Sequence, residues 1–141
     1  MSTIHDYFKT DQFSTHNGIE LIDASNGHAT AKMVVQPHHL NGLGTVHGGA
    51  LFTLADFCFA AACNSHGTVA VAIDANITFM KAISTGVLYA TGKEIAKNFK
   101  LGSYVVEVRN EADELIAQFQ GLAYRKSEPL PFGPPRVQPI A

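Results

Sequence analysis

The residues with the clearest chemical potential lie in one stretch, NGLGTVHGGALFTLADFCFAAAC, which runs from Asn41 to Cys63. Apolar residues surround its one carboxylate, Asp56, in the sequence. An unpaired charge in apolar surroundings costs roughly several kcal/mol, so we expect Asp56 either to have a specific polar partner or to line a wet cleft. A carboxylate perturbed in this way is a candidate general base or nucleophile. The alternative is a satisfied buried acid that caps a loop.

Two glycines precede this acid, where a helix is expected to begin. The sequence His47-Gly48-Gly49 offers no Ser, Thr or Asp at the N-cap, so the first backbone N–H groups of the helix are expected to be free. Free N–H groups at a helix N-terminus bind anions and polarise carbonyls, which suits the oxyanion of an acyl transfer. The alternatives are structural: the glycines permit close packing of the helix on a sheet, His47 fixes the loop, and Asn41 forms a turn.

The helix that must position these groups is expected to be buried. Apolar residues cover every face of it between Ala50 and Ala62, and it is too short to span a membrane. Gly49 and Asp56 are seven positions apart, which corresponds to about 10 Å along a helix axis. One carbonyl can hardly touch both groups of one helix. If both act together, we expect the second to come from another copy of the chain, in a two-fold dimer with sites at its interface.

The rest of the chain predicts an α+β fold, in which a curved antiparallel sheet of five to six strands wraps around the buried helix. Residues 3–15 indicate a short amphipathic helix. Residues Gly18–Val35 indicate a hairpin that turns at Asn26-Gly27. Strand-like runs, rich in β-branched residues or alternating in polarity, follow at Val69–Met80, Val87–Ile95, Gly102–Asn110 and Leu115–Tyr124.

Length and composition indicate a single domain. The 141 residues divide into one domain over residues 1–126 and a proline-rich tail over residues 127–141. The formal net charge of −2 argues against nucleic acid as the main partner. The first ten residues are polar and charged rather than a signal peptide, so we expect a cytoplasmic protein without a membrane partner.

Neither the cysteines nor the neighbouring histidines indicate a metal site. Cys58 and Cys63 both fall on the buried helix and are expected to be free core thiols in a reducing compartment. His38 and His39 are adjacent, so their side chains point in different directions. No carboxylate or cysteine lies at a spacing that would complete a metal pair. We therefore expect no metal and no cofactor.

The pattern of Asn41, the His47–Gly49 motif and Asp56 resembles that of the hotdog-fold thioesterases, and most closely their phenylacetate-pathway (PaaI-like) branch. The resemblance implies an acyl-CoA thioesterase in which the acid at Asp56 acts as general base on water or as nucleophile. It implies that the amide of Gly48 polarises the thioester carbonyl, and that Asn41 and His47 hold the thioester and position the water. Such enzymes are dimers or dimers of dimers, and the acid comes from the opposite subunit.

The resemblance also implies where CoA binds. One turn aligns with a turn that binds the nucleotide and the pantetheine, and it consists of Lys97, Asn98, Phe99, Lys100, Leu101 and Gly102. Further basic residues are candidates to contact the CoA phosphates, namely Lys81, Lys93, Arg125 and Lys126. Gly49 is expected beside the substrate. An apolar acyl pocket is expected from Phe52, Phe57, Phe59 and Phe79.

One departure from the family pattern concerns the attacking water. Some relatives carry a serine at the position of Ala72, where the hydroxyl helps to order the water. Asn64, Ser65 or another water is expected to supply that contact. The expected reaction is hydrolysis of an aryl-acetyl or medium-chain acyl-CoA to the free acid and CoA. The alternatives are a non-catalytic acyl-CoA sensor, which would bind without releasing thiol, and a hotdog dehydratase, which would form a double bond.

Overall fold

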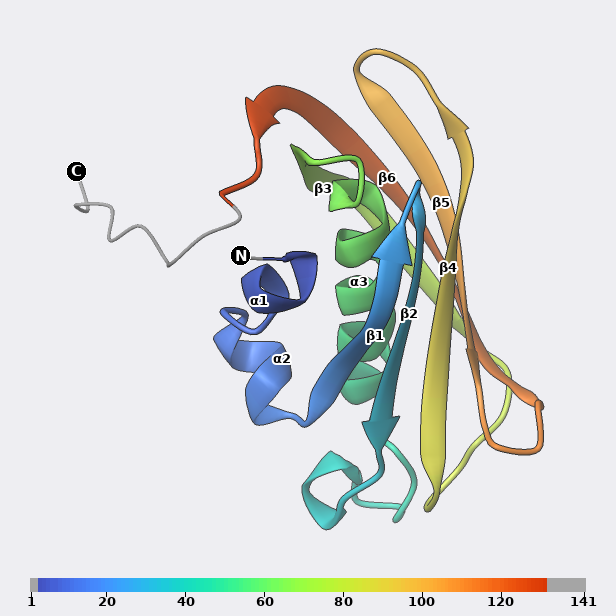
Figure 1. Ribbon diagram of the computed structural model, residues 1–141. Helices are drawn as coiled ribbons and strands as arrows, with labels where there is room; N and C mark the ends of the chain where they lie inside the picture. The colour runs from blue at the N-terminus through green and yellow to red at the C-terminus, as the bar shows by residue number, and fades with distance from the viewer. Residues whose placement is uncertain (1–2, 132–141) are drawn as a thin grey trace.

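A long helix lies inside a curved six-stranded sheet in the computed structural model, which describes residues 3–131 (Figure 1). The elements follow in the order α1 (Ile4–Phe8), α2 (Gln12–His16), β1 (Ile19–Ser25), β2 (His28–Val34), the 3-10 turn η1 (Pro37–His39), α3 (Gly48–Asn64), β3 (Thr68–Phe79), β4 (Val87–Lys97), β5 (Leu101–Arg109) and β6 (Leu115–Pro129). No helix within residues 3–131 is both long and apolar enough to cross a membrane.

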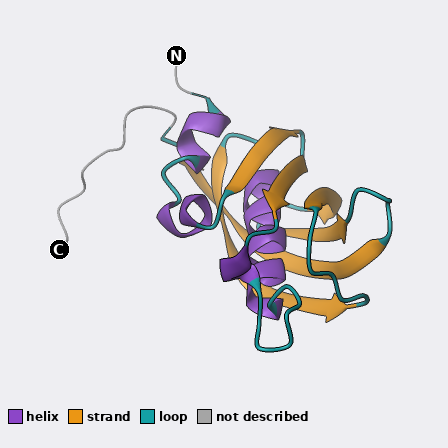
Figure 2. Cartoon of the chain, turned by 90° about the horizontal axis from the view of Figure 1, so that it is seen from below, coloured by secondary structure: helices purple, strands orange, loops and turns teal. Residues whose placement is uncertain are grey.

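The sheet has the strand order β1-β2-β4-β5-β6-β3, and every neighbouring pair is antiparallel. It curves around α3, while α1 and α2 lie on the open side of the helix (Figure 2). The hairpin between β1 and β2 turns at Asn26 and Gly27, which both have positive φ, as a two-residue hairpin turn requires. The α+β fold expected from the sequence, with a sheet wrapped around one buried helix, is therefore confirmed.

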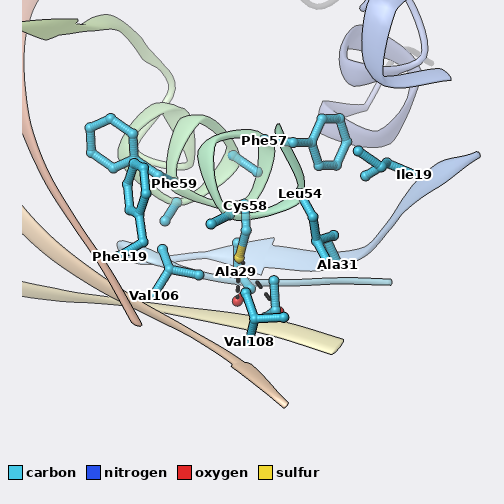
Figure 3. Packing of buried hydrophobic residues seen from close by; sticks show 14 of the residues in the cluster. Ile19, Ala29, Ala31, Leu54, Phe57, Cys58, Phe59, Val106, Val108 and Phe119 are labelled. Carbon is cyan, nitrogen blue, oxygen red and sulfur yellow. Dashed lines mark hydrogen bonds between the residues drawn. The ribbon is translucent and has the colours of Figure 1, made fainter. Parts of the chain in front are cut away.

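The apolar core lies between α3 and the concave face of the sheet (Figure 3). Leu54 and Cys58 point from the helix into this core and are fully buried. The Cys58 thiol lies 3.4 Å from the carbonyl oxygen of Ala29 and 3.5 Å from that of Ala90. Burial raises the pKa of Cys58 and that of Cys63 to about 12. Both cysteines are free, as expected, and their thiols are protonated and inert.

Two expected boundaries differ from the structure. The segment 3–15 forms two short helices rather than one, because Asp11 caps α2 by accepting a hydrogen bond from the Ser14 N–H at 3.0 Å. At the other end, β6 continues to Pro129, beyond the expected strand end at Tyr124, because Thr68 of β3 pairs with Pro129. Residues 132–141 of the expected tail lie outside the described residues.

Gly121 of β6 allows the helix to approach the sheet. A Cβ atom at this position would lie 2.7 Å from a ring carbon of Phe59, which is 1% exposed. The Phe59 ring is itself held by edge or tilted contacts with Tyr104 and Phe119, at centroid distances of 5.5 and 5.6 Å. The ring therefore has little freedom to move away, and a side chain at Gly121 would overpack the core.

We predict that Gly121→Ala lowers the free energy of unfolding by about 1 to 3 kcal/mol, the usual cost of overpacking. Urea denaturation at a fixed protein concentration measures the change. Gly42→Ala is the matched control, because nothing lies within 4 Å of a Cβ atom there, and it should change stability by no more than about 0.5 kcal/mol. Equal effects of the two substitutions would contradict the tight packing of Phe59.

Candidate active site

His47 caps the N-terminus of α3 with its own side chain. Its backbone is extended, with φ −60° and ψ 137°, and its Nδ1 accepts a hydrogen bond from the Gly49 N–H at 2.8 Å. The expectation that the first N–H groups are all free is thus wrong for Gly49. Among the described residues, no acceptor bonds to the N–H of Gly48. The helix therefore presents one open donor, at the end where its dipole is positive.

Phe79, the last residue of β3, covers Gly48. A Cβ atom at Gly48 would lie 2.9 Å from Cζ of Phe79, so glycine is what allows this ring to lie against the start of the helix. The Phe79 side chain is still 54% exposed. The open N–H of Gly48 therefore has an exposed aromatic ring beside it, as the prediction of a substrate contact at Phe79 requires.

Asn41 organises the loop that leads to the helix. Its Oδ1 accepts hydrogen bonds from the N–H groups of Leu43 and Thr45, at 2.9 and 3.2 Å. Its backbone N–H donates to the Thr45 carbonyl at 2.8 Å, and its Nδ2 lies 3.0 Å from Thr45 Oγ1. These hydrogen bonds stabilise the loop, in agreement with the alternative that Asn41 forms a turn. The catalytic role of Asn41 stays a prediction.

Asp56 lies on α3, half-buried. No described residue donates a hydrogen bond to its carboxyl group or forms an ion pair with it. Burial raises the pKa of Asp56 above its ordinary value, and the negative charge of Asp11 raises it further. The sequence left open whether Asp56 has a specific polar partner or lines a wet cleft. Within the described residues, the structure shows no such partner. The carboxyl group is thus available to a group from outside the protomer.

The length of α3 separates the Gly48 N–H from the Asp56 carboxyl group. Gly48 and Asp56 are both within α3 and eight positions apart, which corresponds to about 12 Å along the axis. A carbonyl oxygen at the Gly48 N–H therefore cannot meet the carboxylate of the same helix. The structure brings His47, Gly48, Gly49 and Phe79 together at one end of α3 but does not bring Asp56 to them.

Two of the four residues expected in the acyl pocket, Phe57 and Phe59, belong to the apolar core, although Phe57 also lines a cleft of about 540 Å³ beside α1. Phe57 is 4% exposed and Phe59 is 1% exposed, and both rings lie in the core (Figure 3). Phe57 packs edge-on against Phe8 of α1, at a centroid distance of 5.5 Å. Phe52 is partly buried and packs against Phe119 of β6, at 5.4 Å. A helix that is apolar all round gives no sequence signal for which of its aromatic rings remain accessible.

The predicted CoA turn lies near the other end of α3 (Figure 1). Asn98 closes it, since its Oδ1 accepts from the N–H groups of Lys100 and Leu101 at 2.9 and 2.8 Å. Arg125 of β6 fastens it by donating to the Asn98 carbonyl at 2.6 Å. Phe99 is 83% exposed beside a cleft of about 530 Å³, whose other lining residues are Thr68, Lys100, Tyr124, Arg125, Lys126, Ser127 and Glu128.

The remaining residues of this prediction are less well placed. Lys97 ends β4, while Leu101 and Gly102 begin β5. Gly102 is buried, and a Cβ atom there would lie 2.8 Å from the Tyr104 ring, which indicates a packing role. Lys81 forms an ion pair with Glu114. Lys93 is an exposed residue of β4 and, like Lys81, does not line this cleft.

Ala72 is exposed on β3, directly before a bulge. The residues expected to replace the missing hydroxyl are engaged elsewhere. Asn64 accepts from the Ala70 N–H at 2.9 Å and donates to the Ala60 and Ala70 carbonyls. Ser65 donates to the Ala62 carbonyl and accepts from the backbone N–H of the β1–β2 turn. The source of the missing contact to the attacking water therefore stays a prediction.

Sequence reasoning missed two features next to the helix N-terminus. His39 is 2% exposed and bonded at both ring nitrogens, although nothing in the short polar segment around it indicates burial. The expectation that the His38 and His39 side chains point apart is wrong, because their ring centroids are 4.2 Å apart. A cleft of about 170 Å³ also adjoins His47, and Phe13 of α2 and Thr53 of α3 line part of it. Within residues 3–131, no group of three or more His, Cys, Asp or Glu side chains is placed to hold a metal ion.

Comparisons with known proteins place this arrangement in a family. A putative esterase of Archaeoglobus fulgidus is 41% identical over 91% of this chain and 84% of its own length. The acyl-coenzyme A thioesterase PaaI of Escherichia coli is 36% identical over 86% of this chain and 87% of its own. The structure of E. coli PaaI, from the phenylacetic acid degradation operon, matches with a TM-score of 0.85 over 89% of this chain and 91% of that one, at 34% identity. The model of the thioesterase superfamily matches residues 43–117, and the chain belongs to this superfamily.

Proposed function

We propose that this protein hydrolyses acyl-CoA thioesters, with Asp56 as the base and the Gly48 N–H as the oxyanion donor. The observation that carries the proposal is the half-buried Asp56 carboxyl, which no described residue pairs and whose pKa burial raises. Perturbed carboxylates of this kind are typical of catalytic sites. The similarity to an acyl-coenzyme A thioesterase over most of both chains supports the same reaction class.

The proposal requires a dimer, and the sheet offers a surface for one. β3 is an edge strand of 12 residues. Several of its large apolar side chains, and that of the residue after it, are exposed: Val71, Ile73, Phe79 and Met80. A long apolar edge is a site for pairing with another strand. The opposite edge strand, β1, is flanked by α1, whose His5 Nε2 lies 2.9 Å from the Ile22 carbonyl oxygen. Two copies are therefore inferred to pair through β3.

Pairing of two β3 strands about a two-fold axis would lay the two α3 helices antiparallel. Asp56 of one copy would then approach Gly48 of the other, which the distance along one helix otherwise forbids. The predicted CoA turn lies near the C-terminal end of α3 (Figure 1), and Asp56 lies in the middle of this helix. The partner that supplies Asp56 would thus also bring its own Lys97–Gly102 turn toward the same site. A dimer of such dimers remains the proposed assembly.

The reaction follows from these positions. Ionised Asp56 takes a proton from a water molecule, and the resulting hydroxide attacks the thioester carbonyl carbon. The Gly48 N–H and the positive end of the α3 dipole stabilise the oxyanion that forms. The oxyanion then collapses, the carbon–sulfur bond breaks, and CoA leaves as a thiolate. Direct attack by the Asp56 carboxylate, through an anhydride that water then hydrolyses, is the competing route.

The proposed acyl group is aryl-acetyl or medium-chain. Phe79 is the exposed ring beside Gly48, and an aromatic face binds a flat apolar group well. The relationship to PaaI, whose gene belongs to a phenylacetic acid degradation operon, favours phenylacetyl-like groups. A panel of phenylacetyl-, benzoyl- and octanoyl-CoA would rank these classes.

We predict that Asp56→Asn lowers kcat by about 100-fold or more, because general base catalysis contributes that much. The substitution keeps the size of the side chain and removes its basicity, so the dissociation constant for acyl-CoA should stay within a few-fold of the wild type. Thiol release, followed with a colorimetric thiol reagent, measures kcat, and isothermal titration measures binding to the variant. Normal hydrolysis by the variant would show that Asp56 is not the base.

The pH profile of the wild type is the control for this assignment. Protonation of Asp56 removes the base, so kcat should fall as the pH drops through the raised pKa of this residue. The acid limb should therefore lie above the ordinary aspartate value of about 3.9. The residual rate of Asp56→Asn should lack that limb. Wild-type protein that binds acyl-CoA but releases no thiol at any pH would instead indicate the sensor.

A matched pair of substitutions at Gly48 isolates its N–H group. Gly48→Ala and Gly48→Pro both bring a Cβ atom toward the half-exposed Phe79 ring, but only proline removes the donor. Proline is compatible with the first position of a helix, and His47 already has the extended backbone that a residue before proline adopts. We predict a loss in kcat of about 100-fold for proline, as for other oxyanion donors, and less than about tenfold for alanine. Equal losses would exclude a role for the N–H.

A further inference from the structure

His39 ties the candidate site to the N-terminal helices. It ends η1 and is 2% exposed, in a loop whose neighbouring residue His38 is exposed. The His39 Nδ1 lies 2.9 Å from the backbone N of Gln36, and its Nε2 lies 2.9 Å from the backbone oxygen of Asn17, directly after α2. One side chain thus bonds to two segments that are far apart in the sequence.

These two partners fix the protonation state of the ring. The Gln36 N–H needs an acceptor, so Nδ1 must carry a lone pair. The Asn17 carbonyl needs a donor, so Nε2 must carry the proton. His39 is therefore neutral with its proton on Nε2, and burial lowers its pKa in agreement with this geometry. An apolar residue of similar size would leave two partly buried backbone groups without these partners, which is costly.

The backbone of His39 extends this chain of contacts to the helix N-terminus. Its carbonyl accepts the N–H of His47 at 2.7 Å. His47 in turn caps α3 through its ring and directly precedes Gly48, the residue with the open N–H. Two hydrogen bonds therefore connect the end of α2 to the residue before the proposed oxyanion donor. Another backbone hydrogen bond also holds the loop before α3: the Val46 N–H donates to the Ile83 carbonyl at 2.8 Å.

We propose that His39 is a positioning residue, which holds His47 and the Gly48 N–H at the place where the thioester oxygen binds. The proposal rests on the proposed thioesterase function for its catalytic consequence, but the hold of His39 on the loop does not depend on that function. The Nε2–H bond to Asn17 is the long-range one, since Gln36 lies only three residues before His39. The bond to Asn17 is therefore the one that anchors the loop.

Two substitutions separate the bonds. His39→Asn places an amide oxygen near the position of Nδ1 and keeps the local bond to Gln36, but it loses the donor to Asn17. His39→Gln reaches farther and keeps a donor near the position of Nε2. His38→Gln is the matched control, because it removes the contact of the His38 ring with the His39 ring, at a centroid distance of 4.2 Å, but neither of the two His39 hydrogen bonds. Hydrogen exchange of the His47 amide reports on the loop, exchange of the Val106 amide in the central strand β5 reports on the whole fold, and kcat is compared with the binding of acyl-CoA.

We expect His39→Asn to accelerate exchange at the His47 amide at least tenfold while Val106 exchanges as in the wild type. A misplaced donor should also lower kcat by about 10- to 100-fold with binding nearly unchanged. His39→Gln should recover most of both properties, and His38→Gln should match the wild type.

The proposal is overturned if His39→Asn behaves like His38→Gln, or if His47 and Val106 lose protection equally, which would indicate general destabilisation. Equal behaviour of His39→Asn and His39→Gln would also overturn it, because the bond to Asn17 would then not be the anchor. If even the wild type releases no thiol, the proposed function fails, while the exchange rates still decide whether His39 holds the loop.

Discussion

The packing of α3 against the concave face of the sheet sets the distances on which the rest of the structure depends. Leu54 and Cys58 are fully buried and fix one face of the helix against the sheet. Gly48 stands at its start and Asp56 in its middle. Because the helix cannot bend to bring them together, chemistry that uses both groups must involve two helices. The proposed position of the site at a subunit interface thus follows from the helix geometry.

The same burial gives the two groups their chemical character. Partial burial of Asp56, together with the charge of Asp11, raises the pKa of this carboxyl group and makes it a stronger base when it is ionised. At the start of the helix, His47 satisfies the Gly49 N–H, and the Gly48 N–H stays open. The helix thereby has one donor aimed outward rather than several competing ones. A partly desolvated carboxylate and an oriented donor are groups that can promote thioester hydrolysis.

Sequence patterns could predict the fold because the relevant signals are strong and local. The apolar run around Asp56 and the alternating strands predict the α+β architecture, and the run and the glycines before it lead to the candidate site. The patterns could not show that His47 is the helix cap, since histidine is an unusual cap. Nor could they show that Phe57 and Phe59 are core residues, because periodicity is lost in a helix that is apolar all round. The burial of His39 depends on a contact with α2 that only the folded chain reveals.

The assembly of each site from two chains is the central claim, and mixing two inactive variants tests it most directly. Asp56→Asn lacks the base, and Gly48→Pro lacks the donor. Dissociation and reassociation of an equal mixture should restore roughly a quarter of the wild-type rate, because half of the dimers are mixed and each has one intact site of two. Formation of mixed dimers, verified by native mass spectrometry, with no recovery of thiol release would contradict the claim and place both groups in one chain.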